Sequence, residues 1–329
     1  MHSTPHAAAG AFRAPLGLRH RHVQSLLAGW PVRQRLLRTD ARALLQASQP
    51  ELLDCGDGVK LLGYHAGASG ASRGLAILLH GWEGSAEASY VLSVGGTLHA
   101  AGYDVFRLNF RDHGETHDLN RELFHSCRID EVVGAVRRIA TAHSARRTFL
   151  IGHSLGGNFA LRVAVRAPAI GLQLTKVVAI CPVLRPHSTM RALEQGLWLY
   201  REYFLRRWRR SLLAKAACFP ELYDFGDLRR FPTLTATTAF FVERYTSFAD
   251  LDAYLAGYAV TGRALEGLAV PTRLIAAADD PVIPSDDLRD LASSRSLQID
   301  LFPHGGHCGF LESYRLRSWL DRAVLADLA

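Results

Sequence analysis

The chain has 329 residues, of which 48% are hydrophobic and 21% charged, so it can bury a sizeable core and has too few charges for long disordered regions. The formal net charge is +7, but the basic residues are spread along the chain, so we expect a solvated basic surface and no nucleic-acid partner. No apolar run reaches the ~18 residues that span a bilayer. The first ten residues lack the basic and apolar regions of a signal peptide, and we therefore expect a cytoplasmic protein.

The five cysteines are far apart, and none forms a CxxC pair. This pattern favours reduced thiols over a disulfide framework or a zinc site. The sequence also lacks a phosphate-binding loop and a dinucleotide-binding glycine motif. We therefore expect no metal and no organic cofactor.

From the N-terminus, a basic arm is followed by alternating strands and helices. Residues 1–48 are predicted to form the arm, with short helices, and 51–64 a β-hairpin around a Gly-Asp-Gly turn. Strands are then expected at 75–80, 103–110, 148–152, 176–181, 272–278 and 297–302, and helices up to about 101 and at 129–142, 155–166, 285–292 and from about 310. Buried strands separated by helices predict a mostly parallel, doubly wound α/β sheet covered on both faces.

The alternation stops at Pro182, and residues 183–262 have a helical, aromatic-rich pattern. We interpret this block as an inserted helical cap, with a separate domain as the alternative. The flanking segments 49–182 and 263–329 make a complete sheet only if they join each other, so together they are predicted to form the core domain.

One helix is predicted within the cap, over residues 193–212. Its apolar face carries Leu193, Leu197, Tyr200, Phe204, Trp208 and Leu212 at spacings of three or four. Near the C-terminal end, where cations are favoured by the helix dipole, stand Arg206, Arg207, Arg209 and Arg210. Either the apolar face packs on the core and roofs the site, or it contacts an anionic membrane surface together with the arginines.

The strongest local motif is Gly152-His153-Ser154-Leu155-Gly156, which follows an apolar strand and opens a helix. This is the G-x-S-x-G nucleophile elbow in the strand–turn–helix context that the motif requires. The glycines are needed because strand and helix pass close together in a tight turn. Ser154 is therefore the predicted nucleophile.

A serine hydroxyl needs a base, and the base needs an acid that orients it. In this architecture the partners follow at the ends of later strands, in the order Ser, Asp, His. His307, in the glycine-rich loop after the last strand, is the predicted base, with His304 as its nearest competitor. Asp280 is the favoured acid, and Asp279 stays open, because geometry decides which carboxylate reaches the imidazole.

Acyl transfer also requires N–H donors for the tetrahedral oxyanion. One is predicted to be the backbone amide of Leu155, which follows the nucleophile. The second usually comes from the loop after an early strand. Here that loop is His80-Gly81-Trp82-Glu83-Gly84-Ser85, and we assign the Trp82 amide.

Beyond these generic motifs, the chain resembles the YheT-like esterases (AB hydrolase family 4) of the α/β-hydrolase superfamily from about Arg19 to the C-terminus. The segments that carry the resemblance are HVQSLL, HGWEGS, NFRDHGETHDLN with LFHS, GHSLGGN, FADLDAYL, AADDPVIP and HGGHCGF. The resemblance implies an α/β-hydrolase fold and Ser154, Asp280 and His307 as the triad. Relatives usually have glycine where this chain has Asp112.

These observations together predict a serine hydrolase that cleaves short- to medium-chain or lipid-like carboxylic esters through an acyl-enzyme. The same triad could instead transfer the acyl group to an alcohol, or cleave amides or thioesters. A non-catalytic binding module is the least favoured alternative, because all three triad residues are present. The expected partners are the ester substrate and, through the cap, an anionic membrane.

Overall fold

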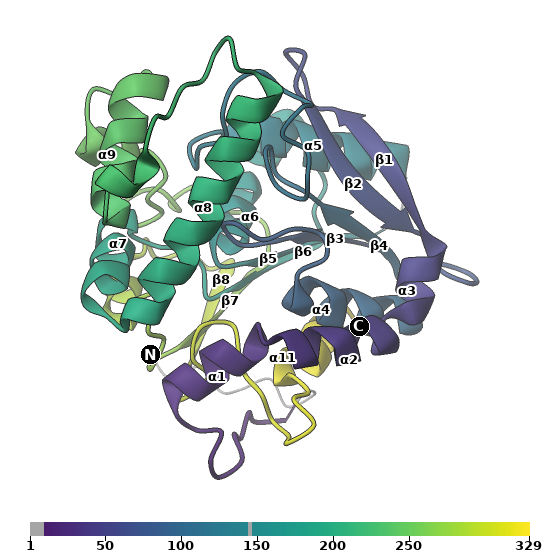
Figure 1. The fold of residues 1–329 in the computed structure, drawn as a ribbon. Helices are drawn as coiled ribbons and strands as arrows, with labels where there is room; N and C mark the ends of the chain where they lie inside the picture. Colours follow the sequence, from purple (N-terminus) through teal and green to yellow (C-terminus); the bar gives the residue numbers. More distant parts are fainter. Residues whose placement is uncertain (1–9, 144–146) are drawn as a thin grey trace.

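The computed structural model describes residues 10–143 and 147–329. Its strands are β1 (Ser48–Asp54), β2 (Lys60–Ala66), β3 (Leu75–Leu79), β4 (Asp104–Leu108), β5 (Thr148–His153), β6 (Lys176–Ile180), β7 (Thr272–Ala277) and β8 (Leu297–Phe302). They form one eight-stranded sheet in the order β1-β2-β4-β3-β5-β6-β7-β8 (Figure 1). The β1–β2 and β2–β4 pairs are antiparallel, and all the other pairs are parallel.

Helices cover both faces of this sheet. On one face α4 (Ser89–Ala100) packs against α11 (Trp319–Leu328), and on the other α5 (Ile129–Ala142) packs against α6 (Leu155–Arg166). A short 3-10 turn, η1 (Pro168–Ile170), follows α6. The predicted mostly parallel, doubly wound sheet is therefore confirmed.

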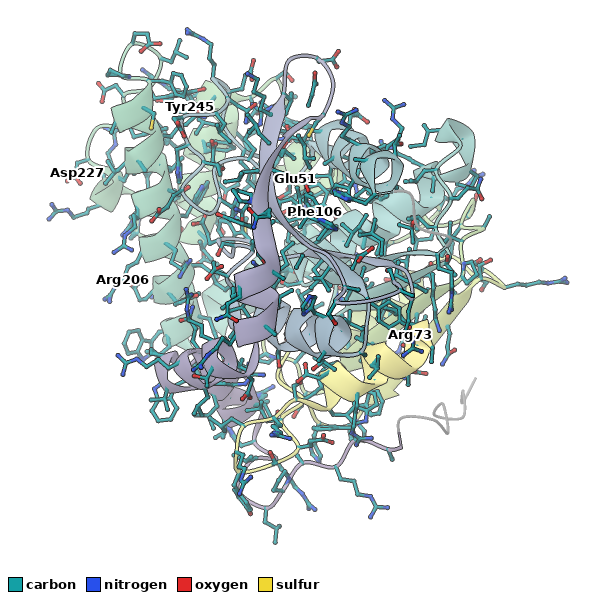
Figure 2. All side chains as sticks on the ribbon, turned by 90° about the vertical axis from the view of Figure 1, so that its right-hand side faces the viewer. Glu51, Arg73, Phe106, Arg206, Asp227 and Tyr245 are labelled. Atoms are coloured by element: carbon teal, nitrogen blue, oxygen red, sulfur yellow. The ribbon has the colours of Figure 1, made fainter. Side chains whose placement is uncertain are left out.

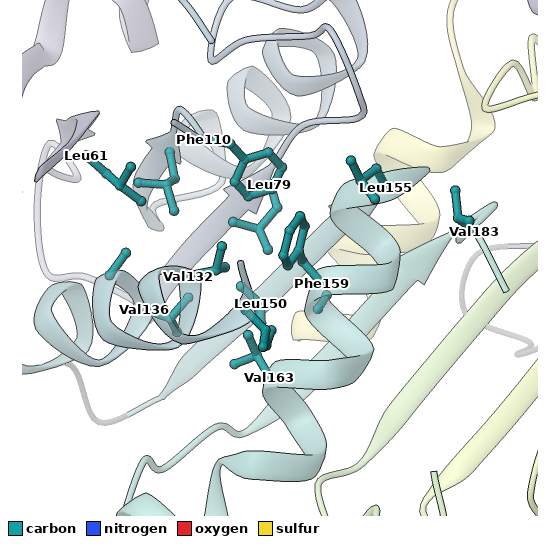
Figure 3. Close-up of a cluster of buried hydrophobic side chains, with 14 of the residues drawn as sticks. Leu61, Leu79, Phe110, Val132, Val136, Leu150, Leu155, Phe159, Val163 and Val183 are labelled. Atoms are coloured by element: carbon teal, nitrogen blue, oxygen red, sulfur yellow. The ribbon is translucent and has the colours of Figure 1, made fainter. Parts of the chain in front are cut away.

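The central strand β3 shows how the two faces share one strand. All five of its residues are buried. Leu75, Ile77 and Leu79 belong to the core under α5 and α6, whereas Ala76 and Leu78 belong to the core under α4 and α11. Successive side chains of a strand point to opposite faces, so an unbroken apolar run marks a strand buried on both sides. Figure 3 shows the first of these cores, where side chains of α5 and α6 meet those of the strands.

The N-terminal segment packs onto the core as three helices, α1 (Arg21–Ala28), α2 (Pro31–Asp40) and α3 (Arg42–Ala47). Arg33 of α2 is 2% exposed and anchors this segment. Its guanidinium donates to the backbone oxygens of Ala28, 2.7 Å away, and Leu316, 2.9 Å away. The basic arm is thus attached to the C-terminal part of the chain.

The segment between β6 and β7 contains α7 (Pro186–Gln195), α8 (Trp198–Cys218), the 3-10 turn η2 (Leu228–Arg230), α9 (Leu234–Tyr245) and α10 (Leu251–Ala256). Figure 1 shows the long α8 running across the side of the molecule that carries α7 and α9. One core side chain holds both ends of this segment. The buried amide of Asn158, on α6, donates to the backbone oxygens of Val183 (2.8 Å) and Tyr258 (2.7 Å).

The prediction of a single helix over residues 193–212 is wrong. α7 ends at Gln195, Gly196 is extended (φ −80°, ψ −158°), and α8 begins at Trp198. Glycine is the residue that leaves a helix most readily, because its backbone is the least restricted. Leu193 therefore belongs to α7. The arginines lie in the middle of the 21-residue α8 and not near its end.

Two further predicted helices have different boundaries. The helix expected over 285–292 is a six-residue 3-10 helix, η3 (Ser285–Asp290), because Leu291 forms a β-bridge with Gly262. The C-terminal helix begins at Trp319 instead of about 310. The backbone N–H and C=O of Leu311 are both bonded to the side chain of Gln24, so they are not free for a helix there.

Asp112 has a φ of 58°, in the left-handed region where glycine would be unstrained. Its carboxylate accepts hydrogen bonds from Lys215 Nζ of α8 (2.8 Å) and from the backbone N–H of Phe124 (2.7 Å). Asp112 is 4% exposed and Lys215 is fully buried. A buried ion pair therefore joins the loop after β4 to α8.

We expect Lys215→Met to destabilise the protein by about 3–5 kcal/mol, because it leaves the Asp112 carboxylate buried and unpaired. Urea unfolding measures this change. The exposed Lys60→Met is the control and should stay within about 0.5 kcal/mol of wild type. Asp112→Gly combined with Lys215→Met should recover most of the loss, because it removes both charges. Equal stability of the two lysine variants would contradict this assignment.

Candidate active site

Ser154 occupies the turn between β5 and α6 with φ 54° and ψ −119°, a conformation that residues other than glycine rarely adopt. Close backbone contacts fix this turn. A Cβ on Gly152 would lie 2.1 Å from the Gly156 oxygen, and a Cβ on Gly156 would lie 2.4 Å from the His80 oxygen. Only glycine fits at these two positions, so β3, β5 and α6 meet there and present the half-buried Ser154 at the start of α6.

The three residues predicted as a triad lie in one hydrogen-bonded line. His307 Nε2 is 3.0 Å from Ser154 Oγ, and His307 Nδ1 is 2.9 Å from Asp280 Oδ2. The other carboxylate oxygen of Asp280 accepts the backbone N–H groups of Val282 (2.8 Å) and Ile283 (3.0 Å). These bonds hold the carboxylate in the orientation that faces the imidazole. The arrangement is that of a nucleophile, a base and an orienting acid.

The two alternatives, Asp279 and His304, make different contacts. Asp279 Oδ1 accepts the backbone N–H of Gly306 at 2.9 Å, and its Oδ2 lies 3.5 Å from Nδ1 of the half-exposed His304. The His307 ring instead donates its Nδ1–H to Asp280. Asp279 therefore holds the backbone of the loop that carries His307.

Burial lowers the pKa of His307, but the Asp280 charge, the neighbouring Cys308 and the hydrogen bond to Asp280 outweigh burial and raise the pKa to about 9. Only the neutral imidazole accepts a proton, and this form is gained as pH rises through the pKa. In the free protein the acceptor form of His307 therefore increases towards alkaline pH.

In the loop after β3, the Trp82 amide is unoccupied while most of its neighbours are hydrogen-bonded. Within residues 80–86, the N–H of Gly81 donates to the hydroxyl of Tyr90 (2.8 Å), that of Glu83 to His113 Nε2 (3.1 Å), that of Gly84 to the Gly81 oxygen (2.9 Å) and that of Ala86 to Asn109 Oδ1 (2.7 Å). The amides of Trp82 and Leu155 have no hydrogen-bond partner within residues 10–143 and 147–329. Both predicted oxyanion donors are thus free to bind a substrate oxygen.

Two buried neutral histidines hold this loop. His113 Nε2 accepts the N–H of Glu83, and His80 Nε2 accepts the N–H of Phe110, each at 3.1 Å. In both rings Nδ1 lies 2.7 Å from a backbone oxygen, so Nδ1 carries the proton. Burial is the main cause that lowers the pKa of His113 to about 4 and that of His80 well below its usual value.

A pocket next to Leu155 is lined by the Trp82 loop, by the start of α6 and by the helices between β6 and β7. Trp82 and Leu155 lie on one side, and the helices contribute apolar side chains that include Leu193, Trp208 and Phe241. The Trp82 ring stacks on Phe204 of α8, with a centroid distance of 5.3 Å, and meets the Trp208 ring edge-on at 5.4 Å. The loop that carries the free Trp82 amide is therefore in direct contact with α8.

Two groups of side chains in the described chain have their ligand atoms close enough to hold a metal ion. They are Cys181 with His307 and Cys308, and Glu51 with His65 and His143. In the first group both ring nitrogens of His307 are already bonded to Ser154 and Asp280. In the second, Glu51 is paired with both histidines at 3.0 and 3.7 Å. The triad and the hydrogen bond between His143 and Glu51 thus explain these contacts.

Comparison with known proteins identifies the family. Residues 76–316 match the model of the Alpha/beta hydrolase family. The chain belongs to this family. The fold is similar to that of an esterase from Pyrococcus furiosus (15% identity, 85% of this chain and 89% of that chain, TM-score 0.56). It is also similar to a 2,6-dihydroxy-pseudo-oxynicotine hydrolase (17% identity, 89% and 70% covered, TM-score 0.58) and to a proline iminopeptidase from Mycobacterium smegmatis (19% identity, 85% and 97% covered, TM-score 0.52).

The residues that support the loops of this hydrolase were not found from its sequence. His80 directly follows β3 and His113 lies in the NFRDHG segment, but 15 histidines in the chain obscure both signals. Tyr90, whose hydroxyl accepts the Gly81 N–H, stands in a helix with no motif around it. Their roles depend on contacts between separate loops, which local patterns do not encode.

We expect Asp280→Asn to lower kcat for a p-nitrophenyl ester by about 10³–10⁴-fold, because only a carboxylate fixes the His307 tautomer and stabilises its cation. Asp279→Asn should cost less than about tenfold, since the amide oxygen of asparagine can still accept the backbone N–H of Gly306. Steady-state kinetics on both folded variants measures the two effects. The assignment of the acid is wrong if Asp279→Asn proves the more damaging.

Proposed function

We propose that this hydrolase cleaves carboxylic esters through an acyl-enzyme formed on Ser154. The observation that carries the proposal is the Ser154–His307–Asp280 line of hydrogen bonds, at 3.0 and 2.9 Å, beside two unoccupied backbone amides. This arrangement supports the proposal, because such groups activate a serine and bind an oxyanion.

In the first half-reaction His307 Nε2 takes the Ser154 proton while Oγ attacks the ester carbonyl carbon. The amides of Trp82 and Leu155 bind the negative oxygen of the tetrahedral intermediate. His307 then gives the proton to the leaving alcohol, and the bond between the carbonyl carbon and the alcohol oxygen breaks. Asp280 stabilises the imidazolium that exists between these two proton transfers.

In the second half-reaction water attacks the acyl-enzyme. His307 accepts a proton from the water, and a second tetrahedral intermediate forms against the same two amides. Its collapse releases the carboxylic acid and returns the proton to Ser154. We propose that the cycle needs no metal and no organic cofactor.

The substrate is proposed to be a short- to medium-chain or lipid-like ester. The support is the apolar lining of the pocket next to Leu155, in which Trp82 also lies among cap side chains such as Leu193, Trp208 and Phe241. Burial of an apolar acyl or alcohol group there would contribute a favourable binding free energy of roughly 25 cal/mol for each Å² of its apolar surface. Membership of the YheT-like branch, with residues 183–262 as the cap, is part of the same proposal.

An acyltransferase, or a hydrolase of amides or thioesters, would use the same groups. One similar structure is a proline iminopeptidase, which keeps the amide alternative in view. Product analysis separates these possibilities: free acid from an ester means hydrolysis, and a new ester formed with a low concentration of an added alcohol means transfer.

No helix among the described residues is both long enough and apolar enough to cross a membrane. A cytoplasmic location remains a proposal, supported by five free cysteines.

We further propose that α8 brings the enzyme to anionic membrane surfaces, by a different face from the one expected. Tyr200, Trp208 and Leu212 are buried against the core, so they are not available to lipid. The opposite face of α8 is exposed and carries Leu199, Tyr203, Arg206, Arg210 and Leu213, spaced four, three, four and three apart. This spacing places them along one stripe of the helix.

The chemistry of this outer stripe fits a lipid interface. Tyr203 is 53% exposed and Leu213 55%, and the Arg207 guanidinium lies 5.5 Å from the centre of the Tyr203 ring. Arg206 points away from the body of the protein (Figure 2). Arg209 does not belong to this surface, because its guanidinium donates to the Phe231 oxygen at 2.6 Å. Aromatic rings and arginines together favour the headgroup region of anionic bilayers.

We expect the wild type to co-sediment with vesicles that contain phosphatidylglycerol but not with phosphatidylcholine alone, and salt should weaken this binding. Reversing Arg206, Arg207 and Arg210 to Glu should reduce binding by at least about 100-fold, at about 1 kcal/mol per basic residue. Activity on a soluble short-chain ester should change far less than vesicle binding. As a control, reversing Arg137, Arg138 and Arg295 to Glu makes the same change in net charge at exposed positions outside α8. Equal binding by both triple variants would rule out the surface.

Ser154→Ala should abolish ester turnover and labelling by a fluorophosphonate, with a loss of several orders of magnitude, because no other group takes the place of the nucleophile. The exposed Ser69→Ala is the control and should behave as wild type. Gel fluorescence and a p-nitrophenyl ester series from two to sixteen carbons give the two readouts. A residual rate within tenfold of wild type would mean that Ser154 is not the nucleophile.

A further inference from the structure

The HVQS segment, His22 to Ser25, belongs to α1 and lies more than 270 residues away in sequence from the loop that carries His307. In the fold the two are neighbours. Ser25 Oγ accepts the backbone N–H of His307 at 2.8 Å, and the same hydroxyl donates to the Arg21 oxygen at 2.7 Å. The base of the proposed triad is thus hydrogen-bonded through its own backbone to the N-terminal helix.

Gln24 holds the other side of this loop. Its side chain is fully buried. Oε1 accepts the N–H of Leu311 at 2.6 Å, and Nε2 donates to the oxygens of Leu311 at 3.1 Å and Leu18 at 2.7 Å. The amide therefore uses both its acceptor and its donors, and it fixes the backbone four residues after His307.

The backbone between these two contacts is unusual. Gly306, Cys308 and Phe310 have φ values of 56°, 55° and 46°, in the left-handed region that costs energy for residues other than glycine. No strand or helix contains this loop. Its conformation must therefore be stabilised by contacts from elsewhere in the chain.

The glycines of the loop are explained by the contact with α1. A Cβ on Gly306 would lie 2.6 Å from the Arg21 oxygen and 2.7 Å from Ser25 Oγ. A Cβ on Gly309 would lie 2.7 Å from the Gln24 oxygen. The loop and α1 are so close that neither position has room for a side chain.

The same helix also touches the cap. His22 Nδ1 lies 3.0 Å from the hydroxyl of Tyr200, on α8. Figure 1 shows α1 next to the first turn of α8. One short segment thus contacts both the loop of the base and the helix that roofs the pocket.

We propose that Gln24 and Ser25 are positioning residues that hold His307 in line with Ser154 and Asp280. The proposal rests on the proposed function, because it assigns the reason for the positioning to the triad. A displacement of about 1 Å at a reacting group can cost about 10²-fold in rate. The hydrogen bond from Ser25 acts on the backbone of the same residue whose ring makes the 3.0 and 2.9 Å contacts.

The role differs from simple anchoring of the arm. Arg33 already attaches this segment to the C-terminal part of the chain through the Leu316 oxygen. Loss of Ser25 or Gln24 should therefore loosen the loop while the helix stays in place. In the wild type the contact with Asp280 raises the pKa of His307. A looser loop weakens this contact, so the pKa of His307 should be lower in the variants.

We expect Ser25→Ala and Gln24→Ala each to lower kcat for a p-nitrophenyl ester by about 10–100-fold with KM within about threefold. The midpoint of the acid limb of the pH profile of kcat/KM should move to lower pH than in the wild type, because the contact with Asp280 that raises the pKa of His307 is weakened. The rate of fluorophosphonate labelling of Ser154 should fall by a factor similar to that in kcat. Ser25→Thr keeps the hydroxyl and should restore most of the activity and the original midpoint.

Two controls separate positioning from stability. Thr39→Ala removes a hydroxyl that bonds the Arg35 oxygen four residues before it, as Ser25 bonds Arg21, but Thr39 is not bonded to the loop. Gln34→Ala removes a glutamine on α2 whose side chain makes no hydrogen bond within the described residues. Both should keep wild-type kinetics, and urea unfolding shows whether all variants are folded in the assay.

The outcomes are distinct for the two proposals. If the wild type reacts with neither the ester nor the fluorophosphonate, the proposed function fails. If the wild type reacts and the Ser25 and Gln24 variants keep its kcat, labelling rate and pH midpoint, the positioning role fails and the proposed function stands. Loss of activity in proportion to the unfolded fraction, without a shift of the pH midpoint, would also overturn the positioning role.

Discussion

The site depends on the approach of three backbones at the carboxyl end of the sheet. β3, β5 and the first turn of α6 come so close at Gly152 and Gly156 that no Cβ fits, and the residue between them is held at φ 54°. Such a conformation costs of order 1–3 kcal/mol. The sheet bears this cost because it is buried on both faces, and the other groups of the site then need only reach one fixed hydroxyl.

Neutral groups support the site where charged ones would disturb it. His80 and His113 accept backbone N–H bonds as uncharged imidazoles, and Tyr90 does the same with its hydroxyl. Burial likewise raises the pKa of the Tyr90 hydroxyl, so this group is uncharged as well. These three side chains therefore add no charge to the buried surroundings of His307 and Asp280. In such surroundings electrostatic interactions are stronger than in water.

The sheet, Ser154 and the loops of His307 and Asp280 were predictable, because each depends on a short local pattern or on the order of strands. The break at Gly196 was not, since the apolar spacing continues across it and hides the end of α7. The choice between Asp279 and Asp280 needed the distance to the ring. Gln24 contacts Leu311 across 287 residues, and no pattern within either segment indicates such a contact.

The amide of Asn158 has a consequence for how this fold can vary. It donates hydrogen bonds to the backbone oxygens of both Val183 and Tyr258, so the chain leaves the core and returns to it at one place. A segment whose ends are already joined adds little loop-closure entropy when its length changes, because that entropy grows only with the logarithm of length. The helices between these two residues could thus be exchanged for a shorter or longer set, giving a new pocket roof over an unaltered Ser154, provided that the asparagine and its two carbonyl partners are kept.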